Sequence, residues 1–203
     1  MLTVHRAVQQ LLSSKAAAIL LRGDPDVRTL AMDLAAATIL TEGTVLWVEA
    51  ANRFDLYAFT EAAKRWGEPP EGFLKRLRIA RAFTIYQLGA LATDVMERTL
   101  RQAPDAVAVV SEPLALAWDA EVPAAEAHRV LCRLVAGLQR VRQHGHRLVI
   151  TAPDPPAAFR HRAGLVDGLA PAATGIVTVR AVEGGVVLQD HSLGTPPRLV
   201  MGG

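Results

Sequence analysis

The stretch 16–38 has the order of elements that surrounds a phosphate-binding loop in α/β proteins. A short apolar run ends at Gly23, an Asp-Pro dipeptide follows, and an Ala/Leu-rich segment covers 26–40. We expect a buried strand, a tight turn and a helix with Asp24 or Asp26 as its N-cap. Backbone N–H groups at the start of such a helix can hold a phosphate. The shape of the segment is therefore that of a phosphate site.

The side chains of this turn do not suit a phosphate. Asp24 and Asp26 place carboxylates where phosphate oxygens would lie, and one such repulsion costs about 4 kcal/mol at ~4 Å and an effective dielectric constant near 20. Val27 stands where a glycine would allow the backbone to wrap closely around the anion. Arg28 offsets part of the negative charge. A helix cap that binds no phosphate is the favoured interpretation.

Asn52 and Arg53 are candidate contacts for a small ligand. They follow the apolar run 44–48, which is expected to be the second strand. In α/β proteins, ligands bind at the carboxyl ends of parallel strands. The sequence therefore places a ligand pocket at these two residues.

A second candidate site is a basic, aromatic motif in the segment that follows the last predicted parallel strand. Guanidinium groups contact phosphates and an adjacent ring stacks on a base, which suits single-stranded DNA. A solvated loop is the alternative interpretation. The motif comprises Phe159, Arg160, His161 and Arg162.

The apolar pattern alternates between strands and helices. Thr84 is the expected N-cap of one helix, and Gly145 is expected to end the last one. This alternation predicts an α/β fold with a mostly parallel sheet and helices on both faces. The expected strands are 16–21, 44–48, 77–83, 106–110 and 147–151, and the expected helices are 26–40, 53–66, 84–101 and 124–143, with a loop at 67–72.

The ends of the chain complete this domain. An irregular, proline-containing segment covers 152–174, and the runs 176–182 and 186–189 form a hairpin expected to extend the sheet as an antiparallel edge. A last short strand is expected at 198–201. The segment 1–14 reads as a helix with one apolar face. No repeat or linker is evident, so we expect a single domain over residues 1–203.

Composition is that of a globular protein. Hydrophobic residues make up 51% and charged residues 21% of the 203 residues, and the net charge of +2 points to no particular partner. Cys132 is the only cysteine, which excludes an internal disulfide and fits a cytoplasmic location. No uncharged apolar stretch reaches the ~18 residues of a membrane span. His144 and His146 lack accompanying ligands, so no metal site is predicted.

With this order of elements, the chain resembles the RecA/Rad51-type ATPase core, nearest to its short archaeal-type Rad51 paralogues and circadian-clock-type relatives. The most specific local match is 78–88, which is similar to the family's strand containing Arg-Ala-Phe and the helix after it. Phe54 matches a phenylalanine that follows the family's second strand. Thr29 matches its magnesium-binding hydroxyl position. The resemblance implies a three-layer P-loop NTPase fold and a DNA-facing loop at 154–174.

The chain departs from the family's catalytic motifs at three places. The first strand of the family ends in Gly-x-x-x-x-Gly-Lys-Ser/Thr, whereas 23–29 is one residue shorter, lacks the second glycine and carries Arg28 in place of the lysine. Ala51 stands at the position of the catalytic glutamate. Ser111 stands at the position of the magnesium-orienting aspartate, with Glu112 one residue further on. Three changes in one machinery indicate that ATP hydrolysis has been lost.

The sequence thus predicts a non-catalytic protein of the Rad51-paralogue kind, an accessory or scaffold in DNA recombination and repair that needs no cofactor. Its expected partners are single-stranded DNA and a RecA/Rad51-type protein, or a second copy of itself. One alternative is a divergent ATPase that uses ATP and Mg²⁺. Another is a regulatory module with a small-molecule pocket at the strand ends. The remnant nucleotide-binding residues are Gly23, Asp24, Arg28, Thr29 and Glu112.

Overall fold

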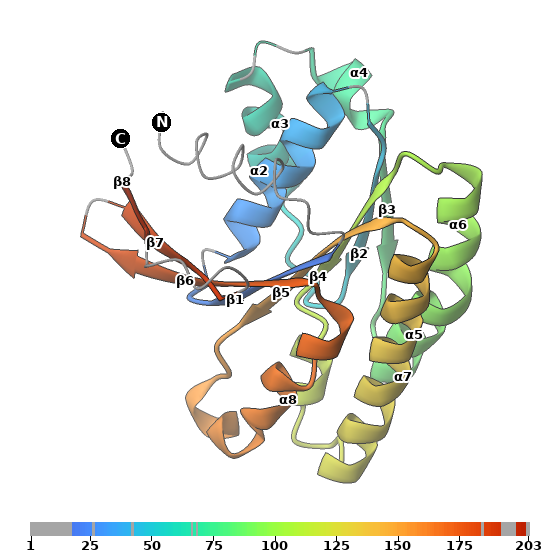
Figure 1. The fold of residues 1–203 in the computed structure, drawn as a ribbon, viewed down its shortest axis with the longest axis vertical. Coiled ribbons are helices and arrows are strands. Elements are labelled where there is room, and N and C mark those ends of the chain that lie inside the picture. Colours follow the sequence, from blue (N-terminus) through green and yellow to red (C-terminus); the bar gives the residue numbers. More distant parts are fainter. Residues whose placement is uncertain are drawn as a thin grey trace.

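The structure is a computed structural model that describes residues 18–25, 27–41, 43–65, 67, 69–183, 185–191 and 198–201. The expected helix at 1–14 and Asp26 lie outside the described residues. The described strands form one eight-stranded sheet in the order β3-β2-β4-β5-β1-β6-β7-β8 (Figure 1). They are β1 (Ala18–Gly23), β2 (Val45–Glu49), β3 (Leu77–Arg81), β4 (Val107–Ser111), β5 (Arg147–Pro153), β6 (Gly175–Val182), β7 (Gly185–Asp190) and β8 (Arg198–Met201).

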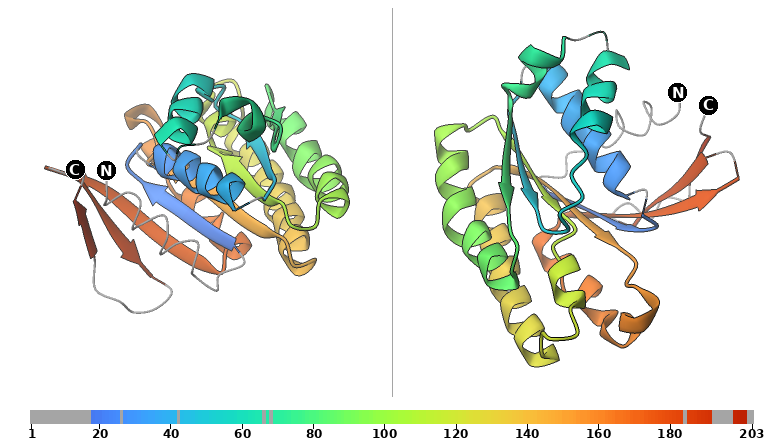
Figure 2. Two further views of the ribbon diagram at one scale, coloured as in Figure 1. Left: turned by 90° about the horizontal axis from the view of Figure 1, so that it is seen from above. Right: turned by 180° about the vertical axis from the view of Figure 1, so that it is seen from behind.

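The sheet is mostly parallel, as the sequence predicts. Every neighbouring pair from β3 to β6 is parallel, whereas β7 runs antiparallel to β6 and β8 antiparallel to β7. The expected hairpin forms, but its first strand, β6, still belongs to the parallel part. The segment 154–174 is long enough for a crossover that returns the chain in parallel to β1. Figures 1 and 2 show β7 and β8 extending to one side of the helices.

Helices cover both faces of the sheet and complete a three-layer α/β fold (Figure 1). On one face lie α2 (Val27–Leu40), α3 (Leu56–Arg65) and α4 (Pro70–Leu74). On the other lie α5 (Ile85–Ala90), the π-helical segment η1 (Leu91–Val95), α6 (Met96–Gln102), α7 (Ala124–Gln143) and α8 (Gly164–Asp167), together with the short 3₁₀ segments η2 (Ala115–Trp118), η3 (Ala157–Arg162) and η4 (Ala170–Ala172).

Strand β1 shows how the sequence specifies the two layers. Its side chains alternate, so that Ile19 and Leu21 pack with α2, and Ala18 and Leu20 pack with the helices of the opposite face. All four residues are buried, as expected for a central strand of a parallel sheet. Because β1 is fixed on both faces, the turn that follows Gly23 begins at a defined point.

The helices differ from the sequence expectation in three places. The second expected helix begins at Leu56 rather than Arg53, because the Asp55 carboxylate accepts the N–H groups of Tyr57 and Ala58 as an N-cap. The expected loop at 67–72 contains the start of α4, and the segment 152–174 contains η3, α8 and η4.

The long helix predicted after Thr84 forms, and Thr84 caps it by accepting the Gln87 N–H. Its middle widens into η1 where it meets α7: a Cβ atom at Gly137 would lie 2.8 Å from the carbonyl oxygen of Ala92. Among the described residues, no helix combines the length and the apolar character that a membrane span requires.

Candidate functional site at the carboxyl edge of the sheet

The turn between β1 and α2 is closed by its own backbone. The N–H of Asp24 donates to the carbonyl of Val179 on β6, at 3.0 Å. The N–H groups of Val27 and Arg28 donate to the carbonyls of Asp24 and Pro25, at 3.1 and 3.2 Å. Pro25 has no N–H to offer. Each of these described groups is therefore already satisfied, so the turn does not present the ring of free donors that a phosphate requires.

The side chain of Asp24 does not occupy the position that the sequence suggested. Its carboxylate accepts the Ala181 N–H and lies 3.4 Å from Nη1 of Arg180. Asp24 therefore does not cap α2, and its charge is directed at β6 rather than into a phosphate position. Gly23 (φ 121°) brings the chain so close to β6 that a Cβ atom there would lie 2.2 Å from the carbonyl oxygen of Val179.

Two arginines and one glutamate meet beside this turn. Nη1 of Arg28, in the first turn of α2, lies 3.2 Å from Oε1 of Glu112, and Nη1 of Arg53 lies 3.8 Å from Oε2. The Glu112 side chain is only 6% exposed, whereas those of Arg28 and Arg53 are 29% and 66% exposed. A single buried carboxylate is thus the shared ion-pair partner of two guanidinium groups, one from α2 and one from the loop after β2.

The position of Glu112 is set by the end of β4. Its φ of 47° is in the left-handed region, and its N–H donates to Oγ1 of Thr151 on β5 at 2.9 Å. Burial raises the pKa of the Glu112 carboxyl, Arg28 and Arg53 lower it in part, and Glu49 raises it further. Glu112 is therefore a carboxyl that takes up a proton more readily than an exposed glutamate.

The Glu49 carboxylate holds the loop that carries Asn52 and Arg53 through hydrogen bonds. This fully buried carboxylate accepts Nε1–H of Trp47 and the N–H groups of Ala51 and Arg53, at 2.9, 3.0 and 3.2 Å. Asn52 has φ 53°, a conformation that asparagine tolerates better than most residues. The Glu49 contacts therefore fix the loop beside the cavity.

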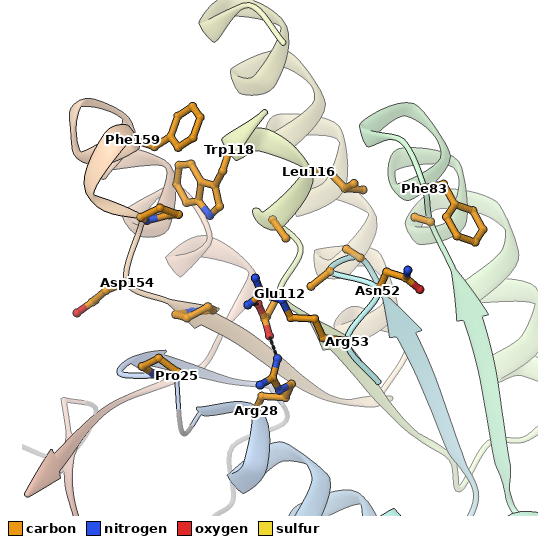
Figure 3. Close-up of a pocket in the computed structure, with 16 residues that line it drawn as sticks. Pro25, Arg28, Asn52, Arg53, Phe83, Glu112, Leu116, Trp118, Asp154 and Phe159 are labelled. Carbon is orange, nitrogen blue, oxygen red and sulfur yellow. Dashed lines mark hydrogen bonds and ion pairs between the residues drawn. The ribbon is translucent and has the colours of Figure 1, made fainter. Parts of the chain in front are cut away.

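These groups surround a cavity of about 460 Å³ at the carboxyl edge of the sheet (Figure 3). Figure 3 shows Trp118, Leu116 and Phe159 on the side opposite Arg28. The structure brings together four predicted residues as lining residues, from the loop after β2, from α2 and from the end of β4: Asn52, Arg53, Arg28 and Glu112. The remaining lining residues are Pro25, Ala50, Ala51, Ala82, Phe83, Ala115, Pro153, Asp154 and Pro156.

The other remnant positions do not add polar chemistry to the cavity. Thr29 is exposed and does not line it. Ala51 lines it with a methyl group. Ser111 is fully buried behind it, and its Oγ has no hydrogen-bond partner among the described residues. Thr29, Ala51 and Ser111 therefore place no polar group in the cavity for a bound phosphate or magnesium ion.

The basic motif 159–162 divides into structural and exposed side chains. Arg162 donates to three carbonyl oxygens in 117–122, at 2.8, 3.4 and 3.0 Å, and its guanidinium lies 5.5 Å from the centre of the Phe159 ring. Phe159 in turn packs at 6.3 Å from Trp118. Arg160 and His161 are exposed. Only these last two are placed to meet a macromolecule.

Sequence reasoning missed the residues that support the site. Glu49, Thr151 and Trp118 have no motif around them. Thr151 acts through Glu112, 39 residues away, and Trp118 through the cavity that it lines. Glu49 acts through N–H groups only two to four residues away. One signal was present: Glu49 is a charged residue at the end of an otherwise apolar strand. Such a residue is buried only when its carboxylate is hydrogen-bonded.

The described residues contain no group of three or more His, Cys, Asp or Glu side chains that could hold a metal ion. His146 is buried and His144 is exposed, with Nδ1 of His144 at 2.8 Å from the carbonyl oxygen of Arg140 at the end of α7. Fold and site together define a three-layer α/β domain with a cavity at the carboxyl edge of its parallel strands. No family model matches the sequence, and no curated protein matches it significantly.

Proposed function

We propose that the chain is a non-catalytic domain of the RecA/Rad51 type that acts as an accessory or scaffold in DNA recombination and repair. The observation that supports loss of catalysis best is the β1–α2 turn. Its described N–H groups are consumed by carbonyls, at 3.0–3.2 Å, on β6 and within the turn itself. A nucleotide phosphate would have to break these bonds before it could be bound.

The arginine that replaces the family's lysine supports the same conclusion. Arg28 is engaged with the buried carboxylate of Glu112. If a phosphate drew Arg28 away, Arg53 at 3.8 Å would be the remaining partner of Glu112, beyond normal hydrogen-bond distance. A divergent ATPase that uses Arg28, Thr29 and Glu112 together would also need the exposed Thr29 to turn toward the site.

The surface around β3 favours a protein partner. This strand ends the sheet order, so one edge of its backbone has no strand beside it among the described residues. Ile79, Phe83 and Tyr86, on β3 and just after it, are 39%, 64% and 61% exposed. Exposed apolar side chains at an open sheet edge are typical of a binding surface rather than of a catalytic one.

Calorimetric titration with ATP and Mg²⁺ tests the loss of catalysis. We expect no saturable binding at micromolar nucleotide. Binding that is abolished in Arg28→Ala, accompanied by steady ATP turnover, would overturn the proposal in favour of the divergent ATPase.

Fluorescence anisotropy with a labelled single strand tests the DNA-binding part. We expect the Arg160→Ala/His161→Ala double variant to weaken binding, and we expect binding to fall with added salt. Arg133→Ala is the matched control because Arg133 is exposed on α7, outside the motif. Equal affinity in the double variant and in the control would limit the proposal to protein binding.

A further inference from the structure

The cavity at the carboxyl edge has the size and construction of a small-molecule site. Its volume of about 460 Å³ is within the ~300–1,000 Å³ of ordinary ligand pockets. It also contains a charged side chain, Glu112, that is 6% exposed and aimed toward two guanidinium groups. Neither feature is needed for an accessory role in recombination.

The polar end of the cavity has more donors than acceptors. Arg28 makes one described hydrogen bond, at 3.2 Å, and Arg53 lies 3.8 Å from the same carboxylate. Asp154 adds no acceptor for these arginines, because it pairs with Arg180 at 2.6 Å and points away from Arg28 (Figure 3). A guanidinium carries five N–H donors, so the contacts among the described residues use only a small part of this donor capacity.

The backbone at this end is strained. Asn52 and Glu112 are the only described non-glycine residues with positive φ, at 53° and 47°, and both line this cavity. Such conformations cost roughly 1–3 kcal/mol and gather at binding sites, where the surrounding structure enforces them. Here the enforcing contacts are the Glu112 N–H bond to Thr151 and the loop bonds to Glu49.

The opposite end of the cavity is apolar. The rings of Trp118 and Phe159 lie 6.3 Å apart and are inclined by 34°. Leu116 lies beside them on the wall that faces Arg28 (Figure 3). Arg162 fixes this wall by binding the carbonyls around η2. This wall faces the small alanine and proline side chains that complete the lining, an environment that suits a flat, apolar body.

We propose that the cavity binds a compact aromatic anion, with its charged group on Arg28 and Arg53 and its ring against Trp118, while Glu112 releases the two arginines and takes up a proton from solvent. The anionic group is a carboxylate or sulfonate on one end of the molecule. This site is independent of the accessory role proposed above, and the two fail in different experiments.

The coupling to a proton follows from the charges around Glu112. Arg28 from α2 and Arg53 after β2 face it, and Glu49 on β2 adds a second negative charge nearby, whereas Asp154 after β5 is held by Arg180. With both glutamates ionised, the two cations are neutralised. Protonation of Glu112 leaves one excess positive charge, which an incoming anion then balances.

Fluorescence titration with 8-anilinonaphthalene-1-sulfonate tests this site. The sulfonate stays ionised throughout, and the matched neutral probe is N-phenyl-1-naphthylamine, which lacks it. We expect the full chain to bind the sulfonate about tenfold more tightly at about pH 4.5, the ordinary pKa of a glutamate carboxyl, than at about pH 7.5. Glu112→Gln is expected to bind it tightly at both pH values, because the arginines are then permanently released.

Two further variants establish where the probe binds. Arg53→Gln alters an exposed side chain and is expected to weaken sulfonate binding severalfold, with little change for the neutral probe. Arg133→Gln, on the exposed face of α7, should leave both affinities unchanged. Arg28→Gln/Glu112→Gln removes both partners of the ion pair and should abolish the preference for the sulfonate.

Thermal melts by circular dichroism confirm that each variant is folded before its titration is interpreted. The proposal is overturned if the two probes bind equally, if pH does not change sulfonate affinity, or if Arg53→Gln behaves like Arg133→Gln. Each of these results would place the probe on an exposed apolar patch outside the cavity, such as that of Ile79 and Tyr86, rather than on the arginines. ATP titration has no bearing on these outcomes, so either proposal can fail alone.

Discussion

The β1–α2 turn and the cavity beside it lie at the same edge of the sheet but differ in how their polar groups are satisfied. In the turn, the described N–H groups donate to carbonyl oxygens at 3.0–3.2 Å, and the Asp24 carboxylate accepts the N–H of Ala181 on β6. In the cavity, two arginines share one carboxylate at 3.2 and 3.8 Å. Satisfied groups stabilise a fold, whereas unmatched charges at a concave surface are available to a ligand. The comparison supports the proposal that a ligand binds in the cavity at the carboxyl ends of β2 and β4 and not at the turn.

The largest effect is expected where the turn meets β6. Gly23→Ala places a Cβ atom 2.2 Å from the backbone oxygen of Val179 and forces alanine into φ 121°. We expect a loss of about 3–5 kcal/mol in the free energy of unfolding, measured by urea denaturation. Gly145→Ala is the matched control because its φ is also positive, at 84°, but its surroundings are open, so the loss should be about 1–2 kcal/mol.

A smaller loss for Gly23→Ala than for Gly145→Ala would show that β6 yields easily to the turn. The turn could then open for a phosphate, and the contrast between the two regions would disappear. That result would favour the divergent-ATPase alternative.

An intermediate effect is expected at the aromatic wall of the cavity. Arg162→Ala leaves the carbonyls of Ala117 and Val122 without their donors and removes the guanidinium beside Phe159. We expect a loss of about 2–3 kcal/mol in thermal or urea unfolding. Arg160→Ala, two residues away on an exposed side chain, should change stability by less than about 0.5 kcal/mol.

This pair of variants separates a structural role, expected for Arg162, from the DNA-binding role that the sequence predicted for both arginines. If Arg162→Ala is as stable as Arg160→Ala, the hydrogen bonds to the loop contribute nothing and both arginines become candidates for nucleic-acid contact. The expected difference instead restricts any DNA surface to Arg160 and His161.

The sequence predicted the architecture well because the fold rests on local patterns. The run 106–110 is specified as a strand by its short length and its valines, and 124–143 is specified as a helix by the periodicity of its apolar stripe. Capping residues such as Thr84 marked one boundary correctly. The predicted start of the second helix was wrong because its N-cap, Asp55, lies inside the segment that was expected to be helical.

The site was predicted only in outline. The carboxyl ends of parallel strands share an edge, so Asn52, Arg53, Arg28 and Glu112 could be placed near one another. The sequence could not show that Asp24 turns to β6, that Arg162 binds η2, or that Glu49 supports the loop. The Asp24 and Arg162 contacts join residues that are remote in sequence. The Glu49 contacts are local, but no motif marks them. The affiliation with the RecA/Rad51 family remains a prediction.

The smallest effect is expected in the pH dependence of stability. The pKa of Glu112 is raised in the folded protein, chiefly by burial, from its ordinary value of 4.5. Its contribution to stability is therefore fully present below about pH 4.5 and is lost as the pH rises through the folded-state pKa. Because one proton is involved, the slope cannot exceed about 1.4 kcal/mol per pH unit.

Glu112→Gln removes this titration, so the free energy of unfolding of the wild type relative to that of the variant should fall as the pH rises above about 4.5. Urea unfolding at a series of pH values measures this difference, and Glu121→Gln, an exposed glutamate in the loop before α7, controls for general charge effects. A relative stability that instead rises with pH would mean that Arg28 and Arg53 outweigh burial. The ion pair would then be as well satisfied as the turn beside it, and the cavity would have no unmatched charge with which to hold an anion.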